Sequence, residues 1–276
     1  MFTETVSIEF AAQIEMCDAN AWRDMYAAAP SNFRSQFKLE LIRVGQIVLT
    51  RCKAIPFIHF NCVMNFGLAQ PATEAQLDHL LHFYDEVGVQ HFAIYHIPHV
   101  QPSTVPEWFR SRKLQHRGGW DRIYRDGRSL TDERIKPQDE VVVEKVTQAT
   151  AEEWAAYIDT WYGLPTTPWL LSLVGRPGWY HYLARRGTHI AAVRTMYVDA
   201  AMAWLGIDAP VPGIMAPSYD LDVQLCQAMV QDGLSLGVRL FVADIEAPNA
   251  AMATPAYDHF EKLGFKRPYS RSHYSY

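Results

Sequence analysis

Four side chains able to exchange protons lie at or near the ends of elements predicted in the C-terminal half of the chain. Asp208 and Glu246 each follow a short apolar run, and Tyr257 and His259 lie two positions apart in a predicted helix. Carboxylate, imidazole and phenol groups are common general acids and bases, so this set is suited to moving protons on a bound substrate. The alternative interpretation is structural, with solvated acids at strand ends and a tyrosine packed as an ordinary aromatic side chain.

A strand, a loop, a helix and a second strand must position these groups. The segment Ala203–Ile207 is predicted to be a strand, and a Pro/Gly-rich loop follows it. Apolar residues then recur at helical spacing until Gly237, and Leu240–Ile245 is predicted to be the second strand. The helical apolar positions are Leu221, Leu225, Met229 and Leu236. A loop that enters a helix N-terminus presents unpaired backbone N–H groups, which suit an anion or another acceptor group.

Composition indicates a folded globular protein. The chain has 276 residues, 49% of them hydrophobic, which is enough for one large or two ordinary domains. The formal net charge of -5 argues against an extended basic surface for nucleic acid. One local basic run is either a solvated rim or a binding face, and it comprises Arg110, Arg112, Lys113, Arg117, Arg122, Arg125 and Arg128.

Cysteine usage and the amino terminus indicate a cytoplasmic protein. The cysteines are Cys17, Cys52, Cys62 and Cys226, and their spacing matches no disulfide framework or metal motif. The first residues lack the basic and apolar regions of a signal peptide, and no run approaches the ~20 apolar residues of a membrane span. We therefore expect a soluble, cytoplasmic protein with no membrane partner.

No metal site is expected. The clustered histidines are His79, His82, His91, His96 and His99. None has an acidic or thiolate partner at the spacing of a metal ligand set.

Several segments resemble those of the GNAT-superfamily N-acyltransferases. In chain order they are Leu171–Trp179, the strand Tyr182–Ala184 with its Arg-Gly turn, the crossover just described, and Tyr257–Phe265. The last is the most specific, because the family closes its fourth helix with a similar E-K-x-G-F. The stretch Phe60–Leu68 resembles a degenerate copy. The resemblance implies an α/β (α+β) fold of two tandem GNAT-like domains, each a mixed, mostly antiparallel sheet flanked by helices.

A polar, charged stretch from Asp126 to Glu140 is the best candidate for a linker between the two domains. Placing the boundary at Ile135 gives a degenerate N-terminal domain over 1–135 and a catalytic domain over 136–276. The strand around Trp120–Arg125 is expected at the edge of the first domain. Helices are predicted from Ser7 to Ala29 and, with Thr73 as N-cap, through Val87.

The resemblance implies an acyl-donor site where the loop enters the crossover helix. Its expected residues are Ile214, Met215, Ser218, Tyr219, Asp220, Leu221 and Val223. The family's loop is close to R/Q-x-x-G-x-G/A, and its amides bind the pyrophosphate of coenzyme A. Here both glycines are missing, Asp220 replaces the arginine and Asp222 adds a second carboxylate. Two carboxylates at the mouth of an anion site repel a diphosphate, although both could instead serve only to start the helix.

The resemblance implies the remaining site residues, because the amide formation of this family needs a deprotonated amine and an acid for the leaving group. By resemblance, Asp208 or Glu246 takes the proton of the amine. The family's usual tyrosine acid is replaced by Phe260, which leaves Tyr257 or His259. The resemblance also implies that the first two helices of the C-terminal domain form the floor of the acceptor pocket, with Trp161, Tyr162 and Trp169, and core packing is their alternative role.

We therefore expect a biosynthetic N-acyltransferase that joins an acyl donor to a small-molecule amine, with no tightly bound cofactor. An acyl-carrier protein or aminoacyl-tRNA donor carries no coenzyme A pyrophosphate and so fits the altered loop, whereas acyl-CoA is the ordinary donor. The alternatives are an acetyl-CoA-dependent N-acetyltransferase, or a silent or remodelled GNAT-like module that binds, hydrolyses or decarboxylates.

Overall fold

The computed structural model describes residues 4–129, 131, 140–210, 219–246 and 250–276. The chain divides into two compact units. The C-terminal unit comprises Trp120–Pro268 together with the amino terminus up to Glu4, and the N-terminal unit comprises Thr5–Gly119 and Tyr269–Tyr276. The last strand therefore folds with the first half of the chain. The domain boundary at Ile135 stays a prediction.

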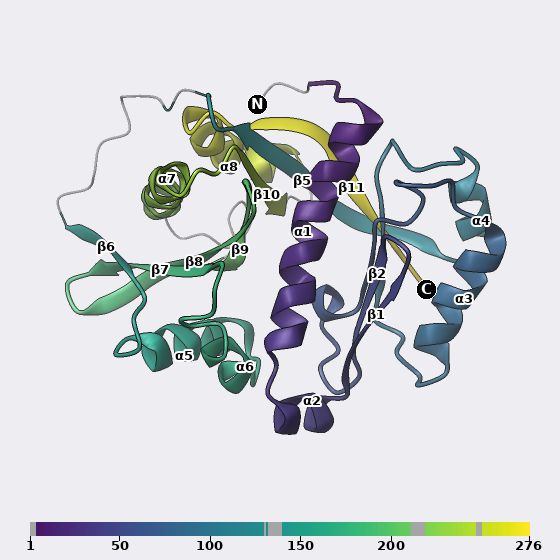
Figure 1. The fold of residues 1–276 in the computed structure, drawn as a ribbon, viewed down its shortest axis with the longest axis horizontal. Helices are drawn as coiled ribbons and strands as arrows, with labels where there is room; N and C mark the ends of the chain where they lie inside the picture. Colours follow the sequence, from purple (N-terminus) through teal and green to yellow (C-terminus); the bar gives the residue numbers. More distant parts are fainter. Residues whose placement is uncertain (1–3, 130, 132–139, 211–218, 247–249) are drawn as a thin grey trace. The chain divides into compact units, whose positions relative to one another are not determined.

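The N-terminal unit is a mixed sheet with helices (Figure 1). Its strand order is β1-β2-β3-β4-β11, with β3 and β4 parallel and the other neighbours antiparallel. The elements are α1 (Ile8–Ala28), α2 (Ser31–Phe37), β1 (Leu39–Val44), β2 (Ile47–Cys52), η1 (Ile58–Phe60), β3 (Cys62–Met64), α3 (Glu74–Asp85), β4 (Ala93–His96) and α4 (Val105–Ser111). Two further strands, β5 (Gln115–Asp126) and β11 (Lys266–Ser275), contribute residues to both units.

Local caps fix the two predicted helices of this unit. The Ser7 hydroxyl accepts from the Phe10 amide at 3.2 Å and begins α1. Thr73 and Gln76 form a capping box at α3, in which each side chain accepts from the other's backbone N–H. Such caps satisfy donors that the first helical turn leaves open. Both helices and the Thr73 cap are confirmed.

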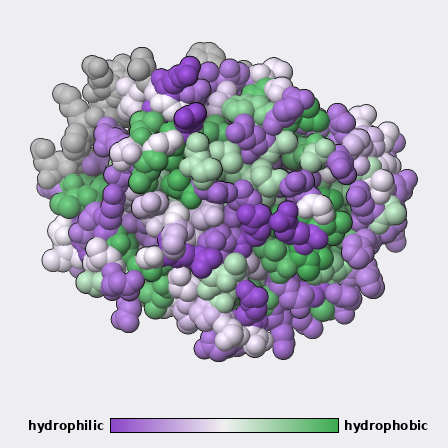
Figure 2. All heavy atoms as spheres, in the orientation of Figure 1, coloured by the Kyte–Doolittle hydropathy of each residue, from purple (hydrophilic) through white to green (hydrophobic). Residues whose placement is uncertain are grey.

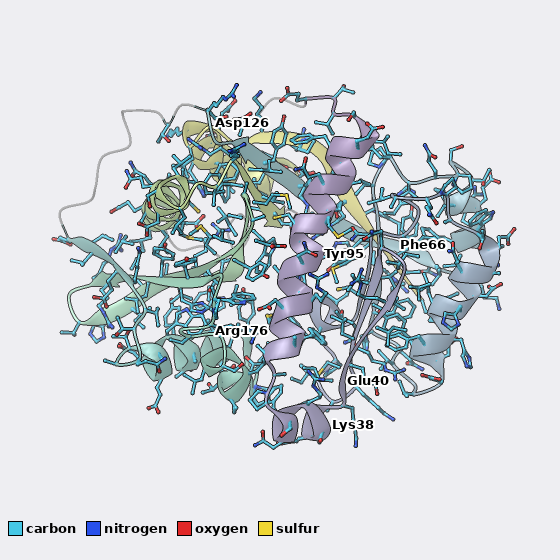
Figure 3. The ribbon with its side chains drawn as sticks, in the orientation of Figure 1. Lys38, Glu40, Phe66, Tyr95, Asp126 and Arg176 are labelled. Atoms are coloured by element: carbon cyan, nitrogen blue, oxygen red, sulfur yellow. The ribbon has the colours of Figure 1, made fainter. Side chains whose placement is uncertain are left out.

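The core of the N-terminal unit includes buried charges. The Arg271 guanidinium contacts the carboxylates of Glu15, at 3.3 Å, and Asp18. It also lies over the ring of Tyr95, which is labelled in Figure 3, at 4.1 Å. The Tyr95 hydroxyl in turn lies 2.8 Å from Cys62 Sγ. These contacts connect β11 to α1 and β4, so the last strand is bound by charge as well as by backbone pairing.

The C-terminal unit also has strands of mixed direction. Its order is β5-β10-β9-β8-β7-β6, and only β9 and β10 are parallel. Its elements after β5 are β6 (Val141–Lys145), α5 (Ala151–Tyr162), α6 (Thr167–Leu171), β7 (Trp179–Arg186), β8 (His189–Asp199), β9 (Met202–Ala209), α7 (Tyr219–Ser235), β10 (Leu240–Glu246) and α8 (Ala250–Lys262).

Helices cover both faces of this sheet, with α5 and α6 on one side and α7 and α8 on the other (Figure 1). The predicted crossover from β9 through α7 to β10 is confirmed. Leu221, Leu225 and Met229 are buried in the core beneath α7. The prediction that Leu236 shares this face was wrong, because α7 ends at Ser235 and Leu236 is 47% exposed.

The predicted edge position of the strand near Trp120–Arg125 was also wrong. β5 pairs antiparallel with β10 over seven residues, from Asp126↔Leu240 to Trp120↔Glu246. As a result Arg122 and Arg125 are buried, and the basic run of the sequence is not one solvated surface. Figure 2 shows hydrophilic and hydrophobic residues interspersed over the drawn face. Among the described residues, no helix is long and apolar enough to cross a membrane.

Candidate active site

A β-bulge in β9 shapes the most chemically distinctive part of the C-terminal unit. Val193 pairs with Ala209 and Thr195 pairs with Gly206, so Arg194 faces two residues, Ile207 and Asp208. Ile207 has a φ of 46°, which is rare for a β-branched residue. Bulges redirect side chains and leave one residue outside the ladder. The bulge therefore sets the direction of the Asp208 side chain.

The same end of β9 lies where the parallel ladder stops. β9 and β10 pair only from Met202↔Leu240 to Trp204↔Val242, within the residues that the structure describes. Both strands continue, to Ala209 and Glu246. Asp208 therefore lies on a segment of β9 whose backbone has left its parallel partner, where backbone groups can meet a ligand.

The bulge lies against a buried group of ionisable side chains, here called the charge cluster. Its members are Arg194 of β8, Asp208 of β9, Asp222 and Cys226 of α7, and His259 of α8. Arg194 Nη1 lies 2.6 Å from Asp222 Oδ1 and 2.9 Å from Cys226 Sγ, and its Nη2 lies 3.2 Å from Asp208 Oδ2. His259 Nε2 is 2.8 Å from Asp222 Oδ2.

Charges within the cluster oppose one another. Burial alone would raise the pKa of Asp222, but Arg194 and His259 outweigh it and hold that pKa below its usual value. For Asp208, burial prevails and raises the pKa, with the charge of Asp222 adding to the rise and Arg194 opposing it. Asp208 is also the more exposed of the two acids, at 22% of its side chain against 8%. Asp208 is thus the carboxylate that accepts a proton more readily.

Asp222 does not occupy the place expected from the sequence. It was predicted at the mouth of an anion site, yet its side chain is buried beside Arg194 and His259. Helical spacing explains this, since Asp222 and Cys226 are four residues apart and share the face of α7 that meets the sheet. Its charge is compensated by a cation, so it does not act as an uncompensated repulsive charge against a donor phosphate.

Some of the predicted donor-site residues lie outside the described part of the chain, and others are buried in the core. Ile214, Met215 and Ser218 lie outside the described residues, as do the side chains of Tyr219 and Asp220 in the first turn of α7. Leu221 and Val223 are 2% and 8% exposed and belong to the core. A role for these two in donor binding would have to use their backbone.

The predicted acid–base residues fall into separate groups. His259 joins Asp208 in the charge cluster through Asp222 and Arg194. Tyr257 instead donates its hydroxyl hydrogen to Asp121, which also binds Arg267 at 3.0 Å.

Tyr257 is therefore committed to another partner. Burial and the Asp121 carboxylate raise the pKa of Tyr257 to about 12, so it holds its proton firmly. Glu246 ends β10, and its side chain lies outside the described residues.

The predicted acceptor residues come from α5 and α6. Tyr162 donates a hydrogen bond to the backbone carbonyl of Asp208 and is partly exposed, which places its ring beside the bulge. Trp161 is also partly exposed and stacks on Tyr157 with centroids 6.4 Å apart. Trp169 is only 2% exposed, which favours its core-packing role. Asp159 fixes the α5–α6 turn by accepting from the amides of Thr166 and Thr167 at 2.8 and 2.7 Å.

Sequence reasoning missed Arg194 and Cys226 as members of this site. The available signal was one arginine in the otherwise apolar or neutral run Ile190–Tyr197. A charge in a buried strand requires a partner, because an isolated buried charge is very costly. Its position therefore predicts acidic residues on a helix that packs against β8.

A cavity of about 220 Å³ in the N-terminal unit is lined by Val44, Ile47, Thr73, Ala75, Gln76, His79 and Leu80. None of the predicted catalytic residues is among them. Within the described ranges, no three His, Cys, Asp or Glu side chains are arranged to hold a metal ion.

Comparisons with known proteins give structural matches only. No family model and no curated protein sequence matches the chain. A GCN5-related N-acetyltransferase from Kribbella flavida matches with a TM-score of 0.61 and 11% identity, over 95% of both chains. One from Sphaerobacter thermophilus matches at 0.54 and 12%, over 84% of this chain and 81% of that one. A tandem GNAT protein from the clavulanic acid biosynthesis pathway matches at 0.52 and 12%, over 86% and 81%.

Proposed function

We propose that this chain, which has the fold of the GCN5-related N-acetyltransferases, is an N-acyltransferase acting on a small-molecule amine. The predicted GNAT fold and mixed α/β class are confirmed by these matches. The matched enzymes are named as acetyltransferases, and at such low identity they support the fold alone. The activity is therefore argued from the site.

The observation that carries the proposal is the Asp208 carboxylate on the β9 bulge. It is partly exposed, its pKa is raised by burial, and it lies where β9 and β10 have stopped pairing. A carboxylate with a raised pKa in a partly buried position is suited to act as a general base near neutral pH. We assign that role to Asp208.

In the proposed reaction, Asp208 accepts a proton from the protonated amine of the acceptor. The neutral nitrogen attacks the carbonyl carbon of an acyl thioester or ester donor, so that a C–N bond forms. The C–S or C–O bond then breaks, the nitrogen gives its second proton to the leaving group, and Asp208 releases the first proton to solvent. Backbone N–H groups freed by the bulge are the proposed donors to the developing oxyanion. Tyr162 and Trp161 are the proposed wall of the acceptor site.

The proposed donor is an activated acyl group, either an acyl thioester carried by coenzyme A or by an acyl-carrier protein, or the ester of an aminoacyl-tRNA. The case against acyl-CoA has weakened, because Asp222 is paired inside the protein. Only the missing glycines and Asp220 still favour a donor without a pyrophosphate.

The test is acyl transfer to a panel of small amines from acetyl-CoA, an acyl-carrier protein and an aminoacyl-tRNA, with products identified by mass spectrometry. Asp208→Asn keeps the shape of the side chain but removes the base. Loss of a general base typically costs about 10²–10⁴ in rate, and we expect a kcat reduction in that range. Glu246→Gln is made in parallel because Glu246 was the other predicted base.

Glu152→Gln, an exposed acid on α5, is the matched control and should transfer at the wild-type rate. Wild-type protein that transfers from no donor would favour the silent-module alternative. Full activity in Asp208→Asn would show that Asp208 is not the general base of the transfer reaction.

A further inference from the structure

Arg194 is a fully buried cation that touches neither the proposed donor site nor the proposed acceptor wall among the described contacts. It is 1% exposed and is opposite the two bulge residues in the β8–β9 register. The proposed chemistry gives it no direct part. Its partners nevertheless come from three separate elements, β9, α7 and α8.

We propose that Arg194 is a positioning residue for the transfer reaction, held under the β9 bulge by Asp222 and His259 so that it fixes the Asp208 carboxylate. The inference depends on the proposed function, since it concerns how the proposed base is presented. It assigns a role to the buried members of the charge cluster.

The geometry supports a clamp with two ends. A guanidinium is planar and presents its N–H groups in a fixed arrangement, so binding one carboxylate orients the other end. Here Nη1 binds Asp222 and Nη2 binds Asp208, at 2.6 and 3.2 Å. The shorter contact lies on the helix side, where Asp222 also meets His259 at 2.8 Å. The contact with Asp222 therefore holds the guanidinium in place, and the contact with Asp208 orients the carboxylate on the bulge.

The ring of Phe260 also holds the guanidinium in place. It lies 5.2 Å from the guanidinium carbon of Arg194 and packs against His259 with centroids 4.4 Å apart. A cation over an aromatic ring is stabilised by the ring's electrons, and the contact also limits the guanidinium to one plane. Phe260 therefore supports the clamp.

Arg194 and Asp222 carry opposite charges, so the proposal predicts opposite effects on Asp208 when each is removed. Arg194 from β8 contacts Asp208 directly. The other titratable groups of the cluster contact Arg194 or Asp222, and they are Asp222 and Cys226 from α7 and His259 from α8. Arg194 favours the ionised form of Asp208, and Asp222 disfavours it. Removing Arg194 must therefore raise the pKa of Asp208, and removing Asp222 must lower it.

The experiment measures kcat/KM for acyl transfer against pH in Arg194→Met and Asp222→Asn. Activity requires ionised Asp208, so the acidic limb of the profile follows its pKa. Arg194→Met should move that limb to higher pH, and Asp222→Asn to lower pH, each by about 0.5–1 pH unit. Arg194→Lys keeps the positive charge, so the midpoint of its acidic limb should lie close to that of wild type, while its kcat should be lower. Arg185→Met, which removes an arginine bound to Glu144 and Glu153, should leave the profile unchanged.

A second readout needs no activity and separates failure of this inference from failure of the proposed function. Carboxyl ¹³C resonances of labelled aspartate report ionisation directly, and Asp208→Asn assigns the Asp208 signal. The same opposite shifts should appear there. If the Asp208 resonance shows opposite pKa shifts in the two variants but the wild type transfers no acyl group, the proposed function is refuted and the contact of Arg194 with Asp208 is supported. Shifts in one direction in both variants, or none in folded protein, would overturn the clamp.

Discussion

Tyr162 donates its hydroxyl hydrogen to the backbone carbonyl of Asp208, which connects the last residue of α5 to the bulge of β9. A second tyrosine of the same helix, Tyr157, donates to the carbonyl of Ala191 on β8 at 3.0 Å. The two bonds are chemically alike. Only the first one reaches the residue that we assign as the base, and this difference gives a matched pair of variants.

Tyr162→Phe and Tyr157→Phe should each reduce the free energy of unfolding by about 1 kcal/mol, the usual net value of one such hydrogen bond. Tyr162→Phe should also reduce kcat/KM for transfer about tenfold, because the bulge carbonyl loses its fixed donor. Tyr157→Phe should not change transfer. Denaturant titration and steady-state kinetics on both proteins check this. Equal kinetic losses in the two variants would show that α5 packing, not the Asp208 contact, is responsible.

Gly206→Ala should destabilise the C-terminal unit and reduce activity. A Cβ at this position would lie 2.2 Å from the indole ring of Trp204, two residues earlier on β9. Overpacking of this kind typically costs about 1–3 kcal/mol, and here the strain falls one residue before the bulge. We expect a fall in Tm that is partly recovered in Gly206→Ala/Trp204→Leu. A wild-type Tm in the single variant would contradict the close packing.

Much of the local structure followed from the sequence, whereas the site depended on long-range pairing. Apolar spacing and Gly237 were sufficient to predict the β9–α7–β10 crossover. The bulge at Ile207–Asp208 was not predictable, because it consists of two residues opposite one on another strand. Asp222 has the residue type of a helix-start acid, and only the position of Arg194 beneath α7 makes it an ion-pair partner.

The two strands that contribute to both units, β5 and β11, also could not be placed from the sequence. β5 carries several arginines and therefore resembles an edge strand, but the pairing with β10 buries Arg122 against Asp244 at 3.1 Å. β11 pairs with β4, from which it is separated by most of the chain. Local patterns carry no information on which distant strand will be the neighbour, so the composition of the two units could not be predicted.

His181 should make the stability of the C-terminal unit depend on pH. It is 3% exposed, lies beside the rings of Trp154 and Trp179, and burial lowers its pKa from 6.5 to about 4. Between these values the unfolded chain binds a proton that the folded chain does not. Its contribution is thus complete above pH 6.5 and is lost as pH falls towards 4, at up to about 1.4 kcal/mol per pH unit.

The measurement is denaturant unfolding at several pH values between 6.5 and 5, followed by tryptophan fluorescence. Wild type should lose about 1.5 kcal/mol over this range from His181. His181→Gln should show a correspondingly smaller slope, and His189→Gln, an exposed histidine of β8, should keep the wild-type slope. An unchanged slope in His181→Gln would mean that burial does not lower the pKa of this ring below its unfolded value.

Thiol labelling should report the opening of the two units separately. All four cysteines are buried. Cys17, Cys52 and Cys62 lie in the N-terminal unit and Cys226 in the C-terminal unit. Burial raises the pKa of Cys52 to about 11 and that of Cys62 to about 12, and it also raises that of Cys226. Because the thiolate is the reactive form, native protein should react with iodoacetamide roughly 100-fold or more slowly than unfolded protein.

Labelling at increasing denaturant, with each cysteine peptide quantified by mass spectrometry, then gives one midpoint per thiol. Gly206→Ala should lower the midpoint of Cys226, which is in the same unit, and leave those of Cys52 and Cys62 within error. Such a selective shift requires that the C-terminal unit opens by local unfolding of its own. If all four midpoints move together, the chain unfolds as one cooperative body, and the division at Gly119 and Pro268 has no energetic counterpart.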